Sequence, residues 1–321
     1  MTKKKKKASI SLDLDNQWSY MKIHGDNGWE DYPSYLNIFV PHILKVLDEL
    51  NLKITFFIVG QDAVLKKNQK FLKMITDHGH EVGNHSFHHE SWIHKYTKEQ
   101  LREELRSAED AIVFATGEKP VGFRGPGFSW SKELLEVLNE MEYIYDASTL
   151  PTWIGPLARR YYFMTASLSK EEKKNRDDLF GNFSDGRRPV KPYSWKINDV
   201  KTILEIPVTT IPVLRIPFHL SYLLFLSGIS KFLMRIYLKM AVFFCKITNT
   251  QPSFLLHPLD LIGGDQITQL TFFPGMNISS DKKVDVFKTV FSELSKHFEL
   301  VNMSNHATYL SQNKNLKEKL L

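Results

Sequence analysis

Two kinds of hydrophobic pattern alternate along this chain of 321 residues. Short runs rich in β-branched and aromatic residues predict strands, and longer runs with apolar positions three and four residues apart predict amphipathic helices. The predicted strands cover residues 8–14, 53–60, 81–86, 120–124, 143–148, 203–211, 253–260 and 298–303. The predicted helices cover residues 38–50, 62–77, 98–116, 132–141 and 283–296. This alternation predicts an α/β fold with parallel strands, either a doubly wound sheet or a barrel.

Polar side chains near the ends of the predicted strands favour the barrel. Asp13, Asp15, His85, Arg124 and Asp146 all lie at or near the C-terminal end of a predicted strand. In (β/α) barrels the functional side chains gather at that end. The sequence therefore predicts one barrel with a single active site at its C-terminal face.

The pattern also divides the chain into segments. We expect a basic tail over residues 1–7, a single barrel domain over residues 8–310 and a polar tail over residues 311–321. Within the barrel, a polar stretch rich in Gly and Pro predicts an insertion or long loop over residues 155–200, after the fifth strand, and residues 216–248 form an apolar helical region.

Charge and cysteine content narrow the choice of partners and compartment. The formal net charge is +6, and Lys3 to Lys7 supply five of these charges, so the rest of the chain is nearly neutral. A nucleic-acid partner is not expected, because it would need a basic patch on the folded part. Cys245 is the only cysteine, which suits a reducing compartment, and the first apolar run carries Asp13, unlike a secretory leader. We expect a cytoplasmic protein.

The apolar helical region has two interpretations. Its longest uncharged run, residues 216–230, is too short and too interrupted by Pro217 and Gly228 for a membrane span. Beyond it, Lys231, Arg235 and Lys239 recur every four residues and share one helical face. Such a helix either packs in the protein with this stripe in water or lies in a membrane interface. The second option predicts peripheral contact with the inner face of the membrane.

The first predicted strand carries two carboxylates on one face. Its period of two places Asp13 and Asp15 together, opposite Ile10 and Leu12. Neighbouring negative charges repel, so we expect a cation over them. His85 and His89 have the spacing at which two imidazoles reach one metal ion, and a carboxylate is the natural third ligand. In this interpretation Asp15 is that ligand and Asp13 is a general base.

Five motifs then occur in a fixed order. They are Asp13-x-Asp15, His85-Ser-x-x-His89, FRGPG around Arg124, YDAS around Asp146, and Leu-His257-Pro. In order and spacing the chain resembles the NodB-homology polysaccharide deacetylases, carbohydrate esterase family 4, over about residues 9–301. The resemblance implies a distorted (β/α) barrel.

The resemblance also implies a role for each motif residue. Asp15, His85 and His89 would bind a divalent metal, most often zinc (Zn²⁺), and Asp13 would be the general base. Arg124 would orient Asp13, and His257 would be the general acid that protonates the leaving amine. Asp146 would steady the His257 imidazolium. A backbone N–H near residues 124–127 would stabilise the oxyanion.

The implied reaction is metal-dependent hydrolysis of an N-acyl amide, typically N-acetyl, on a sugar. Leu14 separates the two aspartates and Asn16 follows them, a form that resembles the subgroup of cytoplasmic amide hydrolases acting on small molecules or lipid-linked sugars. The resemblance thus implies an N-acylated sugar as the substrate, with a lipid-linked or polysaccharide-precursor sugar as one form of it. Two alternatives stay open: a hydrolase of a small cyclic amide or ureide, and a catalytically silent barrel that binds glycans or membranes.

Several further residues have both a functional and a structural interpretation. Trp18, Tyr20, Trp29 and Trp153 either stack on a sugar or are buried aromatics. His88 and Asp260 are expected to support their neighbours in the motifs. Whether the insertion over residues 155–195 contacts substrate is left open.

Overall fold

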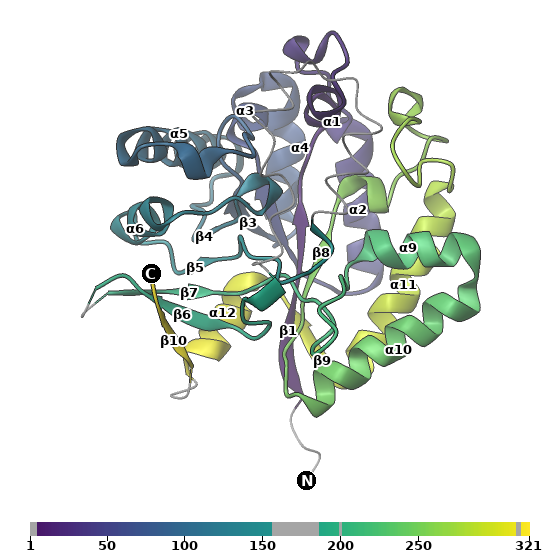
Figure 1. Cartoon of the computed structure of the whole chain (residues 1–321). Coiled ribbons are helices and arrows are strands. Elements are labelled where there is room, and N and C mark those ends of the chain that lie inside the picture. Colours follow the sequence, from purple (N-terminus) through teal and green to yellow (C-terminus); the bar gives the residue numbers. More distant parts are fainter. Residues whose placement is uncertain (1–4, 156–185, 199–200, 313–315) are drawn as a thin grey trace.

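A computed structural model describes residues 5–155, 186–198, 201–312 and 316–321 (Figure 1). The strands are β1 (Lys6–Asp13), β2 (Thr55–Ile58), β3 (Glu81–Asn84), β4 (Gly122–Phe123), β5 (Tyr145–Asp146), β6 (Tyr193–Lys196), β7 (Thr202–Glu205), β8 (Ser253–Leu256), β9 (Phe298–Val301) and β10 (Glu318–Leu320). The helices are α1 (Gln17–His24), α2 (Leu36–Glu49), α3 (Gly60–Val64), α4 (Lys66–Asp77), α5 (Lys98–Thr116), α6 (Lys132–Glu140), α9 (Leu220–Ile229), α10 (Lys231–Ile247), α11 (Ser280–His297) and α12 (Met303–Ser311).

The strands form one sheet in the order β10-β6-β7-β5-β4-β3-β2-β1-β8, with β9 also paired to β1. Each described ladder is parallel except β6 with β7. From β1 to β5 the spatial order follows the chain, with helices between successive strands, as in a barrel that winds in one direction. The predicted α/β fold with parallel strands is confirmed.

The two ends of the sheet approach each other after β7. The backbone N–H of Thr209 donates to the carbonyl of Ser253, at the start of β8, at 3.0 Å, and the N–H of Ser253 donates to Thr209 Oγ1 at 2.7 Å. The described ladders do not pair β7 with β8 as strands. Hydrogen bonds between Thr209 and Ser253, and not a described strand ladder, therefore join the segment after β7 to β8.

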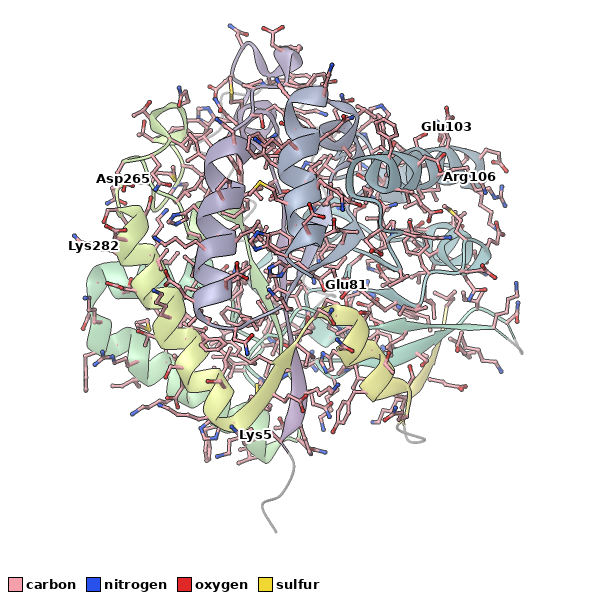
Figure 2. All side chains as sticks on the ribbon, turned by 180° about the vertical axis from the view of Figure 1, so that it is seen from behind. Lys5, Glu81, Glu103, Arg106, Asp265 and Lys282 are labelled. Carbon is pink, nitrogen blue, oxygen red and sulfur yellow. The ribbon has the colours of Figure 1, made fainter. Side chains whose placement is uncertain are left out.

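The core lies on both sides of β1, which explains the opening run of the sequence. Ile10 and Leu12 are fully buried in the largest apolar cluster, against α2. Ser11 and Asp13, on the opposite face, are also buried and point to the interior of the wall. Figure 2 shows α2, α4 and α11 covering the back of the sheet, with Lys5 near the C-terminal end of α11, where its Nζ donates to Ser295. β1 thus pairs with three strands, β2, β8 and β9, and its C-terminal end opens at the site.

Local signals define the ends of the helices. Thr97 and Gln100 form a capping box at the start of α5, and Gly117 ends this helix with a φ of 79°, a left-handed value that favours glycine. Ser230 caps α10 through its side chain. The expected helix over residues 62–77 is instead two helices, α3 and α4, since Leu65 between them is extended.

The tails differ from expectation at both ends. Lys6 and Lys7, expected in the basic tail, belong to β1 and pair with β9. Residues 318–320, expected to fray, form β10 on the edge strand β6, which itself lies in the stretch expected to be a loop. The side chains of β10 are exposed, so its pairing with β6 depends on the backbone. Its sequence therefore has no apolar pattern that would predict a strand. Most of the predicted insertion, residues 156–185, lies outside the described residues.

The apolar helical region contains α9 and α10. In the described part of the chain, neither of these nor any other helix has the length and hydropathy needed to cross a bilayer.

Candidate active site

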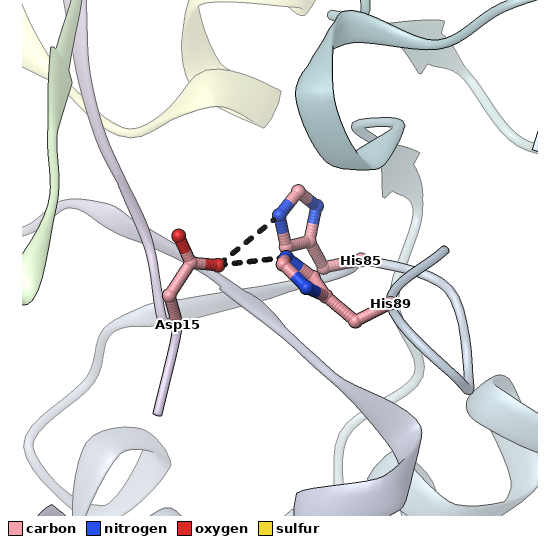
Figure 3. Close-up of side chains that lie close together, drawn as sticks. All are labelled: Asp15, His85 and His89. Atoms are coloured by element: carbon pink, nitrogen blue, oxygen red, sulfur yellow. Dashed lines mark ion pairs between the residues drawn. The ribbon is translucent and has the colours of Figure 1, made fainter. Parts of the chain in front are cut away.

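Asp15, His85 and His89 converge at the C-terminal ends of β1 and β3 (Figure 3). His89 Nε2 lies 2.9 Å and His85 Nε2 lies 3.5 Å from Asp15 Oδ1. The three ligand atoms lie within 4.8 Å of one another, and all three residues are largely buried. The structure therefore brings together the predicted metal ligands across about seventy residues of sequence.

The loop after β3 aims both imidazoles at Asp15. Ser86 and His89 adopt left-handed backbone conformations, with φ of 62° and 58°. The Asn84 side chain accepts from the N–H of Ser86, and the Ser86 hydroxyl accepts from the N–H of His89 at 3.1 Å. The four-residue spacing is thus realised in a tight loop and not in a helix.

The donor set fits a divalent cation. His85 Nδ1 donates to the Arg124 carbonyl at 2.6 Å, which leaves its Nε2 lone pair toward Asp15. Asp15 Oδ1 is buried and has no hydrogen-bond partner in the described structure. Burial alone would raise the pKa of Asp15, but the two imidazoles hold it well below its usual range. Two nitrogens and one oxygen are the protein ligands of a catalytic metal site, which keeps positions open for water.

Asp13 has a different partner. Arg124 Nη1 lies 2.7 Å from Asp13 Oδ1, and the guanidinium also donates to Ser11 Oγ and the Ala147 carbonyl. Arg124 is fully buried, with its guanidinium 4.4 Å from the centre of the Phe57 ring. The two carboxylates of the first strand therefore have separate positive partners: Arg124 for Asp13, and the cation position for Asp15.

His257 lies across the cavity on the loop after β8. Its Nδ1 is 3.6 Å from Asp260 Oδ2, and the same carboxylate accepts from the His257 N–H at 2.9 Å. Burial alone would lower the pKa of His257, but Asp260, and more remotely Asp13 and Asp15, raise it to about 9. His257 is therefore protonated at neutral pH, as a general acid must be.

The structure places Asp260, and not Asp146, beside His257. Asp146 Oδ1 accepts from the Ser148 hydroxyl at 2.6 Å, and Ser148 accepts from the Gly125 N–H at 2.8 Å. Burial raises the pKa of Asp146, and burial with the neighbouring Asp146 raises that of Glu205 further. Asp146 therefore holds the turn after Arg124 and does not steady the acid.

A cavity of about 630 Å³ joins these groups. Its polar end contains Asp13, Asp15, His85, His89 and His257. Its remaining wall is mostly apolar, with Ile23, Leu224, Phe225, Ile229, Phe273 and Ile278 among its members. The volume is in the range of ligand sites and accommodates a sugar with part of an attached group.

The sequence did not single out His219 and Lys283, which also line this cavity. The His219 ring lies 6.2 Å from the His257 ring, its Nδ1 is buried without a partner in the described structure, and burial lowers its pKa to about 4. Lys283 Nζ donates to the carbonyls of Leu259 and Ile262 and so fixes the loop that carries His257. A single His or Lys in an apolar run belongs to no sequence motif that would mark it as functional. Only the fold brings these two residues to the cavity.

The aromatic candidates divide into two groups. Tyr20 lines the cavity. Trp18 is buried, donates to Asp62 Oδ1 at 3.1 Å and packs edge-on against His89, so it supports a ligand from behind. Trp29 packs against Trp18, and Trp153 is partly exposed beside Arg215.

His88 lies inside the metal motif but its ring turns away from the ligands. Its Nδ1 contacts Glu104 Oε2 at 2.7 Å, and more than half of its side chain is exposed.

Comparisons with known proteins find a matching family model and several similar sequences. Residues 4–145 match the family model described as polysaccharide deacetylase. The chain is 32% identical over 119 residues to the peptidoglycan-N-acetylmuramic acid deacetylase of Bacillus subtilis, which covers 37% of this chain and 42% of that protein. It is also 32% identical over 133 residues to the peptidoglycan deacetylase of Helicobacter pylori, covering 39% of this chain and 44% of that protein. The chain thus matches less than half the length of these curated relatives.

A solved structure shares the whole fold. The putative polysaccharide deacetylase from Mycobacterium smegmatis superimposes with a TM-score of 0.61 and 18% identity, over 100% of this chain and 96% of that one. The matched family region contains the predicted metal ligands, Asp13 and Arg124, whereas His257 lies outside it, in a part of the chain that the fold comparison covers.

Proposed function

We propose that this chain belongs to the polysaccharide deacetylase family, whose model matches residues 4–145, and that it hydrolyses the N-acyl amide of a sugar with the help of a bound divalent metal ion. The observation that carries the proposal is the convergence of Asp15, His85 and His89 beside Asp13 and opposite His257 in one cavity. We include Zn²⁺ as the metal, since two imidazoles and one carboxylate suit it.

The protein's own residues then divide the work of the reaction. A cation held by Asp15, His85 and His89 would polarise the acyl carbonyl and make a bound water more acidic. Asp13 takes a proton from the attacking water, with one carboxylate oxygen held by Arg124. His257, kept protonated by Asp260, donates its proton to the departing amine nitrogen.

A residue that lines the cavity also offers a backbone N–H donor for the oxyanion. Within residues 124–127, the N–H of Arg124 donates to Asn84 and that of Gly125 to Ser148, and Pro126 has none. Gly127 lines the cavity, and its N–H has no partner among the described residues. We assign the Gly127 N–H to the developing negative charge on the acyl oxygen.

The shape of the cavity favours a sugar over a small cyclic amide or ureide. A volume of about 630 Å³ is larger than such a small ring needs. The apolar wall through Tyr222, Phe225 and Ile229 favours a sugar that carries a lipid, and we include a lipid-linked sugar at the cytoplasmic face of the membrane in the proposal.

The test compares two aspartate variants on a panel of free, nucleotide-linked and polyprenyl-linked N-acyl sugars plus a cyclic ureide. Asp13→Asn is expected to lower the release of free amine by about 10²- to 10⁴-fold, the usual contribution of a general base, while bound metal stays at the wild-type level. Asp15→Asn is expected to lose both metal and turnover. Asp31→Asn, on the exposed η turn Trp29–Asp31, is the matched control.

Loss of metal in Asp13→Asn would show that the two aspartates have exchanged roles. Wild-type protein with bound metal and no turnover of any acyl amide would contradict the enzyme and favour a silent binding barrel. Turnover of the ureide alone would favour the non-sugar hydrolase.

A further inference from the structure

The outward side of α9 and α10 exposes an unusual number of large apolar side chains. Figure 1 shows these two helices at the outer edge of the molecule, on the right. Phe225 and Ile229 on α9 are 68% and 63% exposed, and Phe232 and Phe243 on α10 are 71% and 56% exposed. Scattered apolar residues on a surface need no explanation, but a contiguous row of them marks an interaction site.

The exposed residues of α10 are not needed for packing, because a separate face of the helix serves the core. Met234, Leu238, Ala241, Val242 and Cys245 are buried and contact the main apolar cluster. The exposed apolar residues Phe232, Ile236, Phe243 and Ile247 follow one another at intervals of four, seven and four residues, so they form one ridge along the opposite side. We call these four residues the apolar ridge. The exposed residues Phe225 and Ile229 of α9 precede it along the chain, Ile229 by three residues.

A row of basic residues accompanies the apolar ridge. Lys231, Arg235, Lys239 and Lys246 are exposed and share the adjacent strip of the α10 surface. The sequence has no Asp or Glu between Glu205 and Asp260, so α9 and α10 bring no negative charge of their own. A side that is apolar along one strip and basic along the next is complementary to an anionic lipid surface.

The apolar ridge is continuous with the wall of the active-site cavity. Phe225, Gly228 and Ile229 belong to both the exposed surface of α9 and the cavity lining. A lipid surface that covers the ridge would therefore reach the edge of the cavity.

We propose that the apolar ridge and its basic row dock this protein on the surface of an anionic bilayer, with the cavity edge at the lipid. A second copy of the chain is a poorer occupant, because a symmetric contact through this side would place the two basic rows near each other. The docking itself does not depend on the proposed function. Its consequence for the substrate does: a sugar on a lipid carrier would reach the cavity directly from the bilayer.

The experiment measures co-sedimentation of the full chain with vesicles of equal parts phosphatidylglycerol and phosphatidylcholine, and with vesicles of phosphatidylcholine alone. The pair Phe232→Ser and Phe243→Ser is expected to lower the partition coefficient at least about tenfold, since each ring loses its burial in lipid. Phe114→Ser is the matched control, because Phe114 is 79% exposed on α5, away from the ridge. It is expected to bind like wild type.

A second set of variants tests the charge. Replacing Lys231, Arg235 and Lys239 by Gln is expected to lower binding to the anionic vesicles by about fivefold per residue at low salt, and to remove most of the preference over neutral vesicles. The control replaces Lys45, Lys66 and Lys70, which are exposed on α2 and α4, by Gln. These controls also hold the lysines at the N-terminus constant.

The outcomes separate docking from catalysis. The docking variants are expected to keep wild-type thermal stability and wild-type turnover of a soluble N-acyl sugar, and Asp13→Asn is expected to bind vesicles like wild type. Equal vesicle binding by wild type and the double Phe variant, or no binding by wild type, would overturn the docking whatever the enzyme assay shows. A dimer of the wild type in light scattering that the double Phe variant dissociates would overturn it in favour of a second copy.

Discussion

His257 and Asp260 are the acid half of the proposed site, and their charges are expected to set its pH range. Burial alone would lower the pKa of His257, but the neighbouring Asp260 carboxylate raises it to about 9. The proton that His257 donates is therefore present at neutral pH and is lost at alkaline pH. With metal bound, kcat/KM of the wild type is expected to hold through neutral pH and to fall on the alkaline side, as His257 loses its proton. Asp260→Asn removes the carboxylate, so the alkaline fall is expected to move toward neutral pH.

The measurement is the pH dependence of kcat/KM on a soluble N-acyl sugar. Asp281→Asn, on the exposed first turn of α11, is the control and is expected to leave the alkaline limb in place. A reduced rate with an unmoved limb in Asp260→Asn would mean that Asp260 acts only on the loop backbone, through the His257 N–H.

At the residue scale, the groups predicted from the sequence are those that stand in motifs. The metal ligands, Asp13 and Arg124 each belong to a local pattern whose chemistry can be read without the fold. Asp260 follows His257 by three residues, just outside the Leu-His257-Pro motif, and the pattern does not say which of Asp260 and Asp146 reaches the imidazole. That choice depends on the turn after β8, in which Pro258 starts a 3-10 helix that folds Asp260 back onto the His257 backbone.

At the element scale, predictions were best where apolar periodicity and caps agree. Helix α5 begins and ends at the predicted residues, because Thr97 caps it and Gly117 stops it. Helix α1, directly after the first strand, was not predicted, because Trp18 and Tyr20 form no apolar stripe at helical spacing. Strand β10 was missed because it buries no side chain and pairs through its backbone. Strand β6 buries Tyr193 and Trp195, but it lies in a stretch whose Gly and Pro content predicted a loop.

Helix α12 and the first half of β1 are joined by a buried histidine that makes stability depend on pH. His306 is fully buried, its Nδ1 lies 2.9 Å from Ser9 Oγ, and burial lowers its pKa to about 3. In the unfolded chain the His306 imidazole binds a proton near pH 6.5, whereas in the folded protein it stays neutral down to about pH 3. The stability from this group is therefore complete above about pH 6.5 and is lost as the pH falls toward 3, at about 1.4 kcal/mol per pH unit.

The test is the free energy of unfolding in urea at several values between pH 7 and pH 4. His306→Gln is expected to lower stability at pH 7, because it changes a buried contact, but to show a shallower fall toward pH 4 than the wild type. His78→Gln is the control, since His78 is exposed beside Asp48. Parallel curves for wild type and His306→Gln would contradict the assignment.

At the scale of the whole molecule, the site is built from two parts of the chain. The matched family region supplies the metal ligands and the base, and the later part supplies His257, the apolar cavity wall and the ridge of α9 and α10. The proposed base and metal ligands therefore lie in the matched region, and the proposed acid and docking side lie in the later part of the chain. On both proposals, substitutions on the outward side of α9 and α10 change docking and leave the reacting groups in place.

The cation position ties the C-terminal end of β1 to the loop after β3, so metal binding is expected to stabilise the whole fold. A ligand that binds only the folded state adds about 2.7 kcal/mol at a concentration one hundred times its Kd. In a chain of this size that corresponds to a rise of roughly 5 °C in Tm.

Adding Zn²⁺ to chelator-treated wild type is expected to produce such a rise in a thermal unfolding scan, and His85→Ala or His89→Ala is expected to abolish it. His88→Ala is the closest control, because His88 lies in the same motif with its ring on Glu104, and it is expected to keep the full rise. An equal rise in His85→Ala and the wild type would place the metal elsewhere.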